Sequence, residues 1–165
     1  MRRRGSSHLS VIHQPNSQEA CIASILIRPV IVADCPALAA LVSGLGYAST
    51  AQEMEQRLQA MPPASYRTFV AEVDGSVVGL VGLMLPPVYT CNEPMGWILV
   101  LVVDPAHRHQ GIGSRLLRHA EQFMASRGAR AFQLYSKFAN EQAHNFYRAQ
   151  GYEPEAYRFL KQPDP

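Results

Sequence analysis

Apolar residues recur along this chain with two periods, and together these periods predict an α/β domain. Short, mainly apolar runs typical of strands occur at 25–28, 68–73, 76–85, 97–103, 131–135 and 155–160. Segments with apolar residues every three or four positions, typical of amphipathic helices, occur at 34–45, 50–61, 114–127 and 140–150. There is no internal repeat, so we expect one domain over residues 24–165.

Local signals support several of these boundaries. Asp34 is placed to cap the first helix, and Thr50 with Glu53 forms a capping box at the start of the second. Asp74-Gly75 between two apolar runs predicts a β-hairpin. The run Trp97–Val103 is almost wholly apolar, which predicts a central strand covered on both faces.

Composition and charge narrow the class of protein. Hydrophobic residues make up 47% and charged residues 17% of the 165 residues, the balance of an ordinary globular domain. Three of the 15 Lys and Arg residues are Arg2, Arg3 and Arg4, and the remaining 12 nearly balance the 13 Asp and Glu residues. The charge pattern therefore does not indicate a nucleic-acid-binding protein.

The N-terminal stretch and the cysteines bear on where the protein works. Residues 1–23 start with basic residues but lack the apolar core of a signal peptide, so we expect a loose N-terminal extension. No apolar run reaches the ~18 residues of a membrane span, and we expect no membrane partner. The three cysteines are scattered and show no metal or disulfide spacing. They favour a reducing, cytoplasmic setting.

The stretch Arg108-His109-Gln110-Gly111-Ile112-Gly113 joins the apolar run at 97–103 to the helical run at 114–127. A glycine turn between a strand and a helix presents free backbone N–H groups at a helix N-terminus, which attracts phosphate. Leu116 stands where a dinucleotide fingerprint needs a third glycine, and Gly113-Ser114-Arg115 lacks the Gly-Lys-Ser/Thr ending of a Walker loop. Two alternatives remain: an Arg-x-x-Gly-x-Gly anion loop and a glycine turn that binds nothing.

This turn resembles the pyrophosphate-binding loop of the GCN5-related N-acetyltransferases (GNAT), which bind acetyl-coenzyme A. A second stretch resembles the last conserved helix of the same family, in which four features recur at the spacings of Asn140, Ala143, Phe146-Tyr147 and Gly151-Tyr152. Both motifs and the order of predicted elements match the family over about residues 25–161. The chain is therefore identified as a member.

The resemblance implies an α/β GNAT fold. This is a central, mixed, mostly antiparallel sheet of about six or seven strands, with a parallel pair at the cofactor cleft and about four helices on both faces. It implies acetyl-coenzyme A as the cofactor, coenzyme A as the product and no metal. The implied cofactor-binding residues lie in the strand, the glycine loop and one helix cap: Leu101, Val102, Val103, Arg108, His109, Gln110, Gly111, Ile112, Gly113, Ser114 and Asn140.

In the family, Tyr147 would donate a proton to the departing coenzyme A thiolate, and Asn140 would hydrogen-bond the cofactor. Seven residues separate the two, which places them on one helix face about 10 Å apart along the axis. A proton donor suits this step because a free thiol has a pKa of about 8.5. The alternatives are a core aromatic for Tyr147 and a plain N-cap for Asn140.

The general base is less well defined. Many family members carry a carboxylate near the start of the central strand, where this chain has Gly96 and Trp97. Glu93, in the preceding loop, is therefore the candidate, and a solvated loop carboxylate is the alternative.

The loops expected to border the acceptor site contain Tyr47 and Tyr89, which are the candidates for substrate contact. An aromatic residue that only covers a core edge is the alternative. These loops hold no carboxylate cluster, which argues against a polycationic acceptor, and Arg67 and Arg158 could favour an acidic amine.

These features predict a cytoplasmic N-acetyltransferase that acts by direct attack in a ternary complex on the primary amine of a small molecule. The alternatives are a non-catalytic acyl-coenzyme A-binding sensor module and a protein or peptide N-acetyltransferase. A homodimer is compatible with the sequence, which does not show one.

Overall fold

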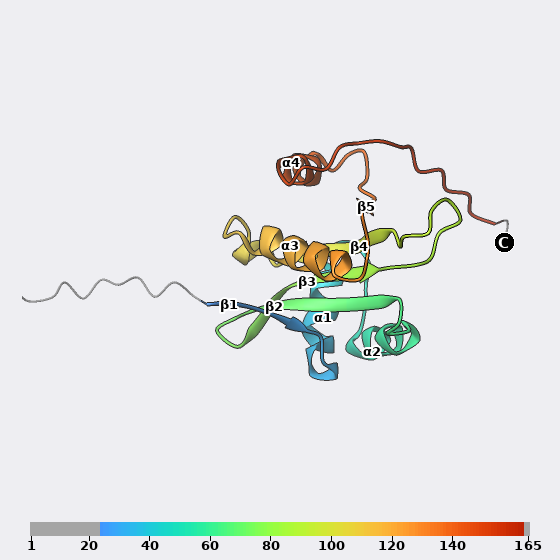
Figure 1. Ribbon diagram of the computed structural model, residues 1–165. Helices are drawn as coiled ribbons and strands as arrows, with labels where there is room; N and C mark the ends of the chain where they lie inside the picture. Colours follow the sequence, from blue (N-terminus) through green and yellow to red (C-terminus); the bar gives the residue numbers. More distant parts are fainter. Residues whose placement is uncertain (1–23, 164–165) are drawn as a thin grey trace, which may run out of the picture.

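The structure of the protein, a computed structural model, describes residues 24–163 (Figure 1). The predicted extension at 1–23 lies outside the described residues. Within them the elements follow in the order β1 (Ile25–Pro29), η1 (Val32–Asp34), α1 (Cys35–Ser43), α2 (Ala51–Ala60), β2 (Tyr66–Val73), β3 (Ser76–Met84), β4 (Gly96–Val103), η2 (Pro105–His107), α3 (Ile112–Ala125), β5 (Phe132–Leu134) and α4 (Glu141–Ala149).

The described residues form one five-stranded sheet in the order β1-β2-β3-β4-β5. Neighbouring strands are antiparallel except β4 and β5, which are parallel. The mixed sheet, the parallel pair and the four α-helices confirm the predicted fold, but the described residues form five strands where about six or seven were expected. The predicted last strand at 155–160 is wrong, because this segment has no regular secondary structure. β5 offers only three residues to pair with, and the segment contacts the end of β5 through side chains.

Helices cover both faces of the sheet: α1 and α2 lie on one face, and α3 and α4 lie on the other (Figure 1). Successive residues of a strand point to opposite faces, so one strand serves two cores. Phe69 packs in the core beneath α3, and the next residue, Val70, packs in the core beneath α1. None of the helices among residues 24–163 combines the length and the apolar composition needed to cross a membrane.

Two local predictions are confirmed. The Thr50 Oγ1 accepts a hydrogen bond from the Glu53 N–H at 3.2 Å, and the Glu53 carboxylate accepts one from the Thr50 N–H at 2.7 Å. This capping box starts α2. Asp74 and Gly75 both have positive φ, 50° and 78°, which is the requirement of a type I′ hairpin turn between β2 and β3.

Asp34 is the N-cap residue of α1, as predicted, but its side chain forms no capping hydrogen bond with this helix. Its carboxylate accepts two hydrogen bonds from the Arg28 guanidinium, at 2.8 and 2.9 Å, and one from the Ile31 N–H at 2.9 Å. Arg28 Nε also donates to Glu72 at 2.8 Å. Asp34 is 6% exposed, and a buried carboxylate is stabilised by a charged partner more than by a helix N–H alone. The network joins β1, β2 and η1.

Candidate functional site

The parallel pair β4–β5 separates after three residues. Pairing covers Gly96–Ile98 of β4 and Phe132–Leu134 of β5. Beyond Ile98, β4 continues from Leu99 to Val103 without a strand partner on this side, among the residues that the structure describes. The open edge is roughly 16 Å long. It offers backbone groups to an extended ligand, which can pair with such an edge as an added strand.

A bulge marks the point of separation. The register between β3 and β4 shifts next to Gly82 and Leu83, so Leu99 has no partner in β3. Leu99 is 45% exposed, and the prediction that this run is covered on both faces is wrong at this position. Bulges twist and redirect a strand and are common beside functional sites.

The glycine loop after β4 alternates the sign of φ. His109 and Gly111 lie in the left-handed region, at 62° and 78°, and Gln110 between them does not. Successive N–H groups in such a conformation point to one side and form a concave anion site. The space beside Gly111 is open, since an added β-carbon would meet nothing within 4 Å. The left-handed backbone conformation of His109 is strained for a residue other than glycine, and such strain is typical of functional loops.

The N-terminus of α3 adds further donors to this loop. The Arg115 N–H donates to the Gly111 carbonyl at 3.0 Å, so the N–H groups of Ile112, Gly113 and Ser114 precede the helical hydrogen-bond pattern. Arg108 Nε donates to the Val103 carbonyl at 3.2 Å and holds the loop to the end of β4. The N–H groups of Ile112, Gly113 and Ser114 therefore lie at the positive end of a helix dipole, next to the loop of His109 and Gly111, whereas the Arg108 N–H donates to the Pro105 carbonyl.

The last helix packs against this loop. The Phe146 ring lies 3.5 Å from the position of a β-carbon built on Gly113, and Val103 Cγ2 lies 3.8 Å from the same position. Asn140 caps α4 by accepting a hydrogen bond from the Ala143 N–H at 3.1 Å. The cap uses only the side-chain oxygen of Asn140, so its amide nitrogen keeps two N–H donors for a ligand.

Tyr147 is mostly buried within an aromatic group. Its ring makes edge-to-face contacts with Phe146, at 5.2 Å between centroids, and with Tyr152, at 5.8 Å. Burial raises the pKa of the Tyr147 hydroxyl above its ordinary value, and no hydrogen bond to it is formed within residues 24–163. The Tyr152 hydroxyl donates to the Glu121 carboxylate of α3 at 2.7 Å. Tyr147 therefore stays protonated at neutral pH and has a proton to donate.

Three segments meet where β4 and β5 separate. Trp97 of β4 makes an edge contact with Tyr135, the residue that follows β5, at 5.4 Å between centroids. The Arg158 guanidinium of the C-terminal segment lies 5.2 Å from the Tyr135 ring centroid. Lys137 Nζ lies 5.8 Å from the ring of Tyr47 in the α1–α2 loop. We call these residues the aromatic corner; the predicted residue Tyr47 joins it through Lys137.

Tyr135 and Lys137 are residues of this corner that were not predicted from the sequence. Their spacing of two, starting from a short apolar run, places them on one face of an extended segment. That pattern was available in the sequence. The sequence does not show which element they would contact, because that contact depends on the register of β5 against β4.

Other predicted residues lie apart from this corner. The Tyr89 side chain is wholly exposed in the loop before β4. Glu93 lies in the same loop, and its carboxylate is 3.8 Å from Arg130 Nε. Arg67 lies over the Phe123 ring of α3, at 5.9 Å, and donates to backbone carbonyls beside it. The structure thus links the glycine loop to Phe146 and Tyr147 of α4, places Tyr47 beside Lys137, and leaves Glu93 and Tyr89 outside both groups.

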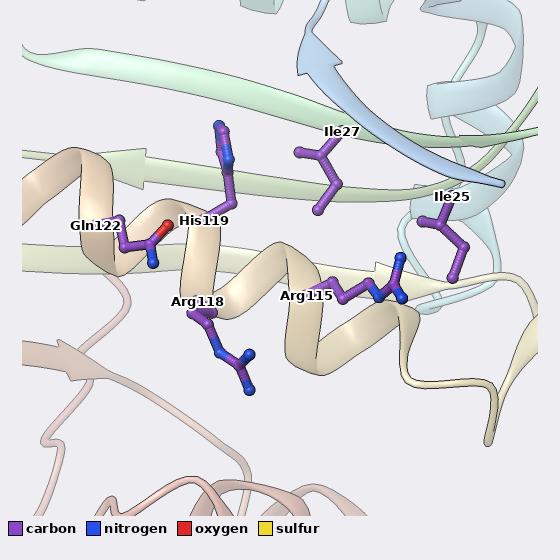
Figure 2. A pocket seen from close by; sticks show the side chains of 6 residues that line it. All are labelled: Ile25, Ile27, Arg115, Arg118, His119 and Gln122. Carbon is purple, nitrogen blue, oxygen red and sulfur yellow. The ribbon is translucent and has the colours of Figure 1, made fainter.

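A separate hollow of about 260 Å³ adjoins β1, at the opposite edge of the sheet from β5 (Figure 2). Its side chains come from β1 and α3: Ile25, Ile27, Arg115, Arg118, His119 and Gln122. Figure 2 shows the Arg118 guanidinium pointing away from β1. The hollow is therefore not part of the β4–β5 opening.

Comparisons with known proteins agree on one family. The model of the acetyltransferase (GNAT) family matches residues 38–152. The chain is 36% identical over 100 residues to the aminoalkylphosphonate N-acetyltransferase of Salmonella typhimurium, over 61% of this chain and 64% of that one. It is 30% identical over 131 residues to the aminoglycoside N(6')-acetyltransferase type 1 of Stenotrophomonas maltophilia, over 77% and 85%.

A solved structure of an aminoglycoside N-acetyltransferase in complex with CoA has the same fold. Its TM-score is 0.75 over 91% of this chain and 99% of that chain, at 17% sequence identity. The match to the Salmonella enzyme spans less than two thirds of that enzyme's length.

Proposed function

This chain belongs to the acetyltransferase (GNAT) family, which uses acetyl-coenzyme A, and on this basis we propose that it acetylates the primary amine of a small molecule. The observation that carries the proposal is the opening between β4 and β5, which ends in the glycine loop at one side and in the aromatic corner at the other. One extended substrate with phosphates at its far end suits this arrangement.

The residues present fit acetyl-coenzyme A. The backbone N–H groups of residues 109–114 hold the pyrophosphate, because they precede or begin a helix and the space beside Gly111 is open. The edge of β4 at Leu101–Val103, which lacks a strand partner, pairs with the extended pantetheine arm. Asn140 donates a hydrogen bond to the cofactor from its amide nitrogen, which the helix cap leaves free. The bound thioester supplies the activated acetyl group.

Tyr147 is the general acid of the proposed reaction. Its hydroxyl holds a proton at neutral pH because the ordinary pKa of tyrosine is about 10 and burial raises it further, and it donates this proton to the sulfur that leaves. The acceptor amine attacks directly in a ternary complex. Glu93 remains the candidate general base, and a base role requires its carboxylate to leave Arg130.

The relatives support a small-molecule acceptor. The two curated relatives are named for aminoalkylphosphonates and aminoglycosides, which are chemically different but are both small-molecule amines. A protein acceptor has no comparable support among these relatives.

A thiol-release assay tests the proposal. The full chain is mixed with acetyl-coenzyme A and a panel of small amines, and free thiol is followed together with the acetylated product. Turnover with at least one small amine is expected. Binding of acetyl-coenzyme A without turnover of any amine in a broad panel would favour the acyl-coenzyme A-binding sensor, and turnover of peptides alone would favour a protein acetyltransferase.

A further inference from the structure

The aromatic corner at the end of β5 carries positive charge that the protein does not neutralise. Lys137 and Arg158 both lie over tyrosine rings there, and neither forms an ion pair within residues 24–163. A cation over an aromatic face is attracted to the ring but keeps its charge. The corner therefore presents two cationic groups without a carboxylate partner.

No carboxylate of the described residues offsets this charge. Glu153 and Glu155, which precede Arg158 in the chain, line a different hollow together with Glu121 of α3. Glu93 lies near Arg130. An acceptor with several positive charges would thus meet two cations at this corner and no free carboxylate.

One buried polar group lies in the same corner. Trp97, which contacts Tyr135, has a buried Nε1, and within the described residues this nitrogen has no hydrogen-bond partner. An indole N–H can only donate. A buried donor without an acceptor costs free energy, which an oxyanion that reaches it would recover.

We propose that the acceptor is a primary amine that also carries an oxyanion, such as a phosphonate or a carboxylate, and that Arg158 and Lys137 bind this oxyanion. The inference rests on the proposed function and names the substrate class of the same site. Arg158 lies over Tyr135, the first residue beyond the separation of β4 and β5.

Four probes in the thiol-release assay test the substrate class. They are 2-aminoethylphosphonate, the carboxylate β-alanine with the same spacer, the neutral isostere 3,3-dimethylbutylamine and the polycationic aminoglycoside kanamycin. We expect the better oxyanionic amine to exceed the neutral isostere in kcat/KM by at least about tenfold, as charge-assisted hydrogen bonds provide. Comparison of 2-aminoethylphosphonate with β-alanine shows whether the site prefers a phosphonate or a carboxylate. Equal or faster turnover of the neutral isostere or of kanamycin would overturn the inference and leave the proposed function intact.

Charge variants test the two residues. Arg158→Gln and Lys137→Gln should each raise KM for the oxyanionic amine about tenfold, with KM for acetyl-coenzyme A and turnover of the neutral isostere unchanged. Arg158→Lys keeps the charge and should recover most of the loss. Arg118→Gln removes a cation from the separate hollow of Figure 2 and is the matched control, without effect on any of these values. An equal loss for charged and neutral amines in Arg158→Gln would contradict the assignment.

A binding measurement keeps this inference distinct from the proposed function. If no amine is turned over, 2-aminoethylphosphonate is titrated into the folded chain saturated with coenzyme A. Binding that is lost in Arg158→Gln would support the oxyanion site while refuting catalysis, and no binding would overturn both.

Discussion

The Phe146 ring and Gly113 face each other at the start of α3, 3.5 Å from ring to β-carbon position. This contact joins the two stretches that carry the family resemblance, although more than thirty residues separate them in the chain. Tyr147, the neighbour of Phe146, contacts the Phe146 ring and packs against the same core. The glycine loop and the proposed proton donor are thereby linked through Phe146.

Gly111→Glu should abolish binding of acetyl-coenzyme A. The substitution strains a residue at φ 78° and places a negative charge among N–H groups that bind phosphate. We expect an affinity loss of at least about 100-fold by calorimetry. Gly75→Glu is the matched control, because Gly75 has the same φ and an equally open side but lies in the β2–β3 hairpin. Similar losses in both variants would sink the loop assignment.

Tyr147→Phe should lower kcat by about 10²-fold or more, with affinity for acetyl-coenzyme A nearly unchanged, because only the donated proton is removed. Steady-state kinetics and titration separate the two effects. Tyr66→Phe, on β2, is the control and should keep full activity. Unchanged kcat in Tyr147→Phe would refute the general-acid role.

The pH dependence follows from the direction of the pKa shift. Burial raises the pKa of Tyr147 above its ordinary ~10, so the donor loses its proton only at pH values above that. Wild-type kcat should therefore show no decline attributable to Tyr147 between pH 7 and 9. A decline in that range that disappears in Tyr147→Phe would contradict the assignment.

Asp34→Asn should lower the free energy of unfolding by about 3 kcal/mol at pH 7, because it leaves the Arg28 guanidinium without its buried partner. The Arg28 hydrogen bonds hold the pKa of Asp34 below its usual value. Its contribution is thus present above about pH 4 and is lost as pH falls through the lower folded pKa.

Urea unfolding of wild type and variant at pH 7 and near pH 3 measures this difference. The gap between them should shrink on acidification. Asp74→Asn, the same change at an exposed turn, should stay within about 0.5 kcal/mol of wild type at pH 7. A gap that does not depend on pH would argue against the ion pair as its cause.

Gly96→Ala should destabilise the fold by about 1–3 kcal/mol. Its β-carbon would lie 2.8 Å from both Met124 Sδ and Phe132 Cδ1, so α3 and β5 must move apart. Gly113→Ala makes a comparison, since its β-carbon would meet Phe146 at an ordinary 3.5 Å. Thermal unfolding should show a lower Tm for Gly96→Ala and an equal or higher Tm for Gly113→Ala. Equal effects would contradict the packing described at Gly96.

Features decided by neighbouring residues could be predicted from the sequence. The capping box of Thr50 and Glu53 and the turn at Asp74-Gly75 involve only local hydrogen bonds and backbone angles, and both are observed. The glycine loop at Arg108–Gly113 belongs to the same class, because its φ values and its position before a helix are local.

Features decided by distant partners could not be predicted. Asp34 resembles a capping residue in the sequence, but its carboxylate accepts hydrogen bonds from the Arg28 guanidinium and none from the helix. The segment 155–160 has the composition of a strand, but its formation depends on the length of edge that β5 offers. The bulge at Leu99 and the meeting of Trp97 with Tyr135 likewise depend on strand register, which the apolar pattern alone leaves undetermined.

Calorimetric titration of the full chain with acetyl-coenzyme A tests the central claim most directly. The account predicts saturable binding with one site per chain, and loss of that binding in Gly111→Glu but not in Gly75→Glu. No binding by a chain shown to be folded by circular dichroism would contradict it, and the β4–β5 opening would then be a feature of the fold without a cofactor.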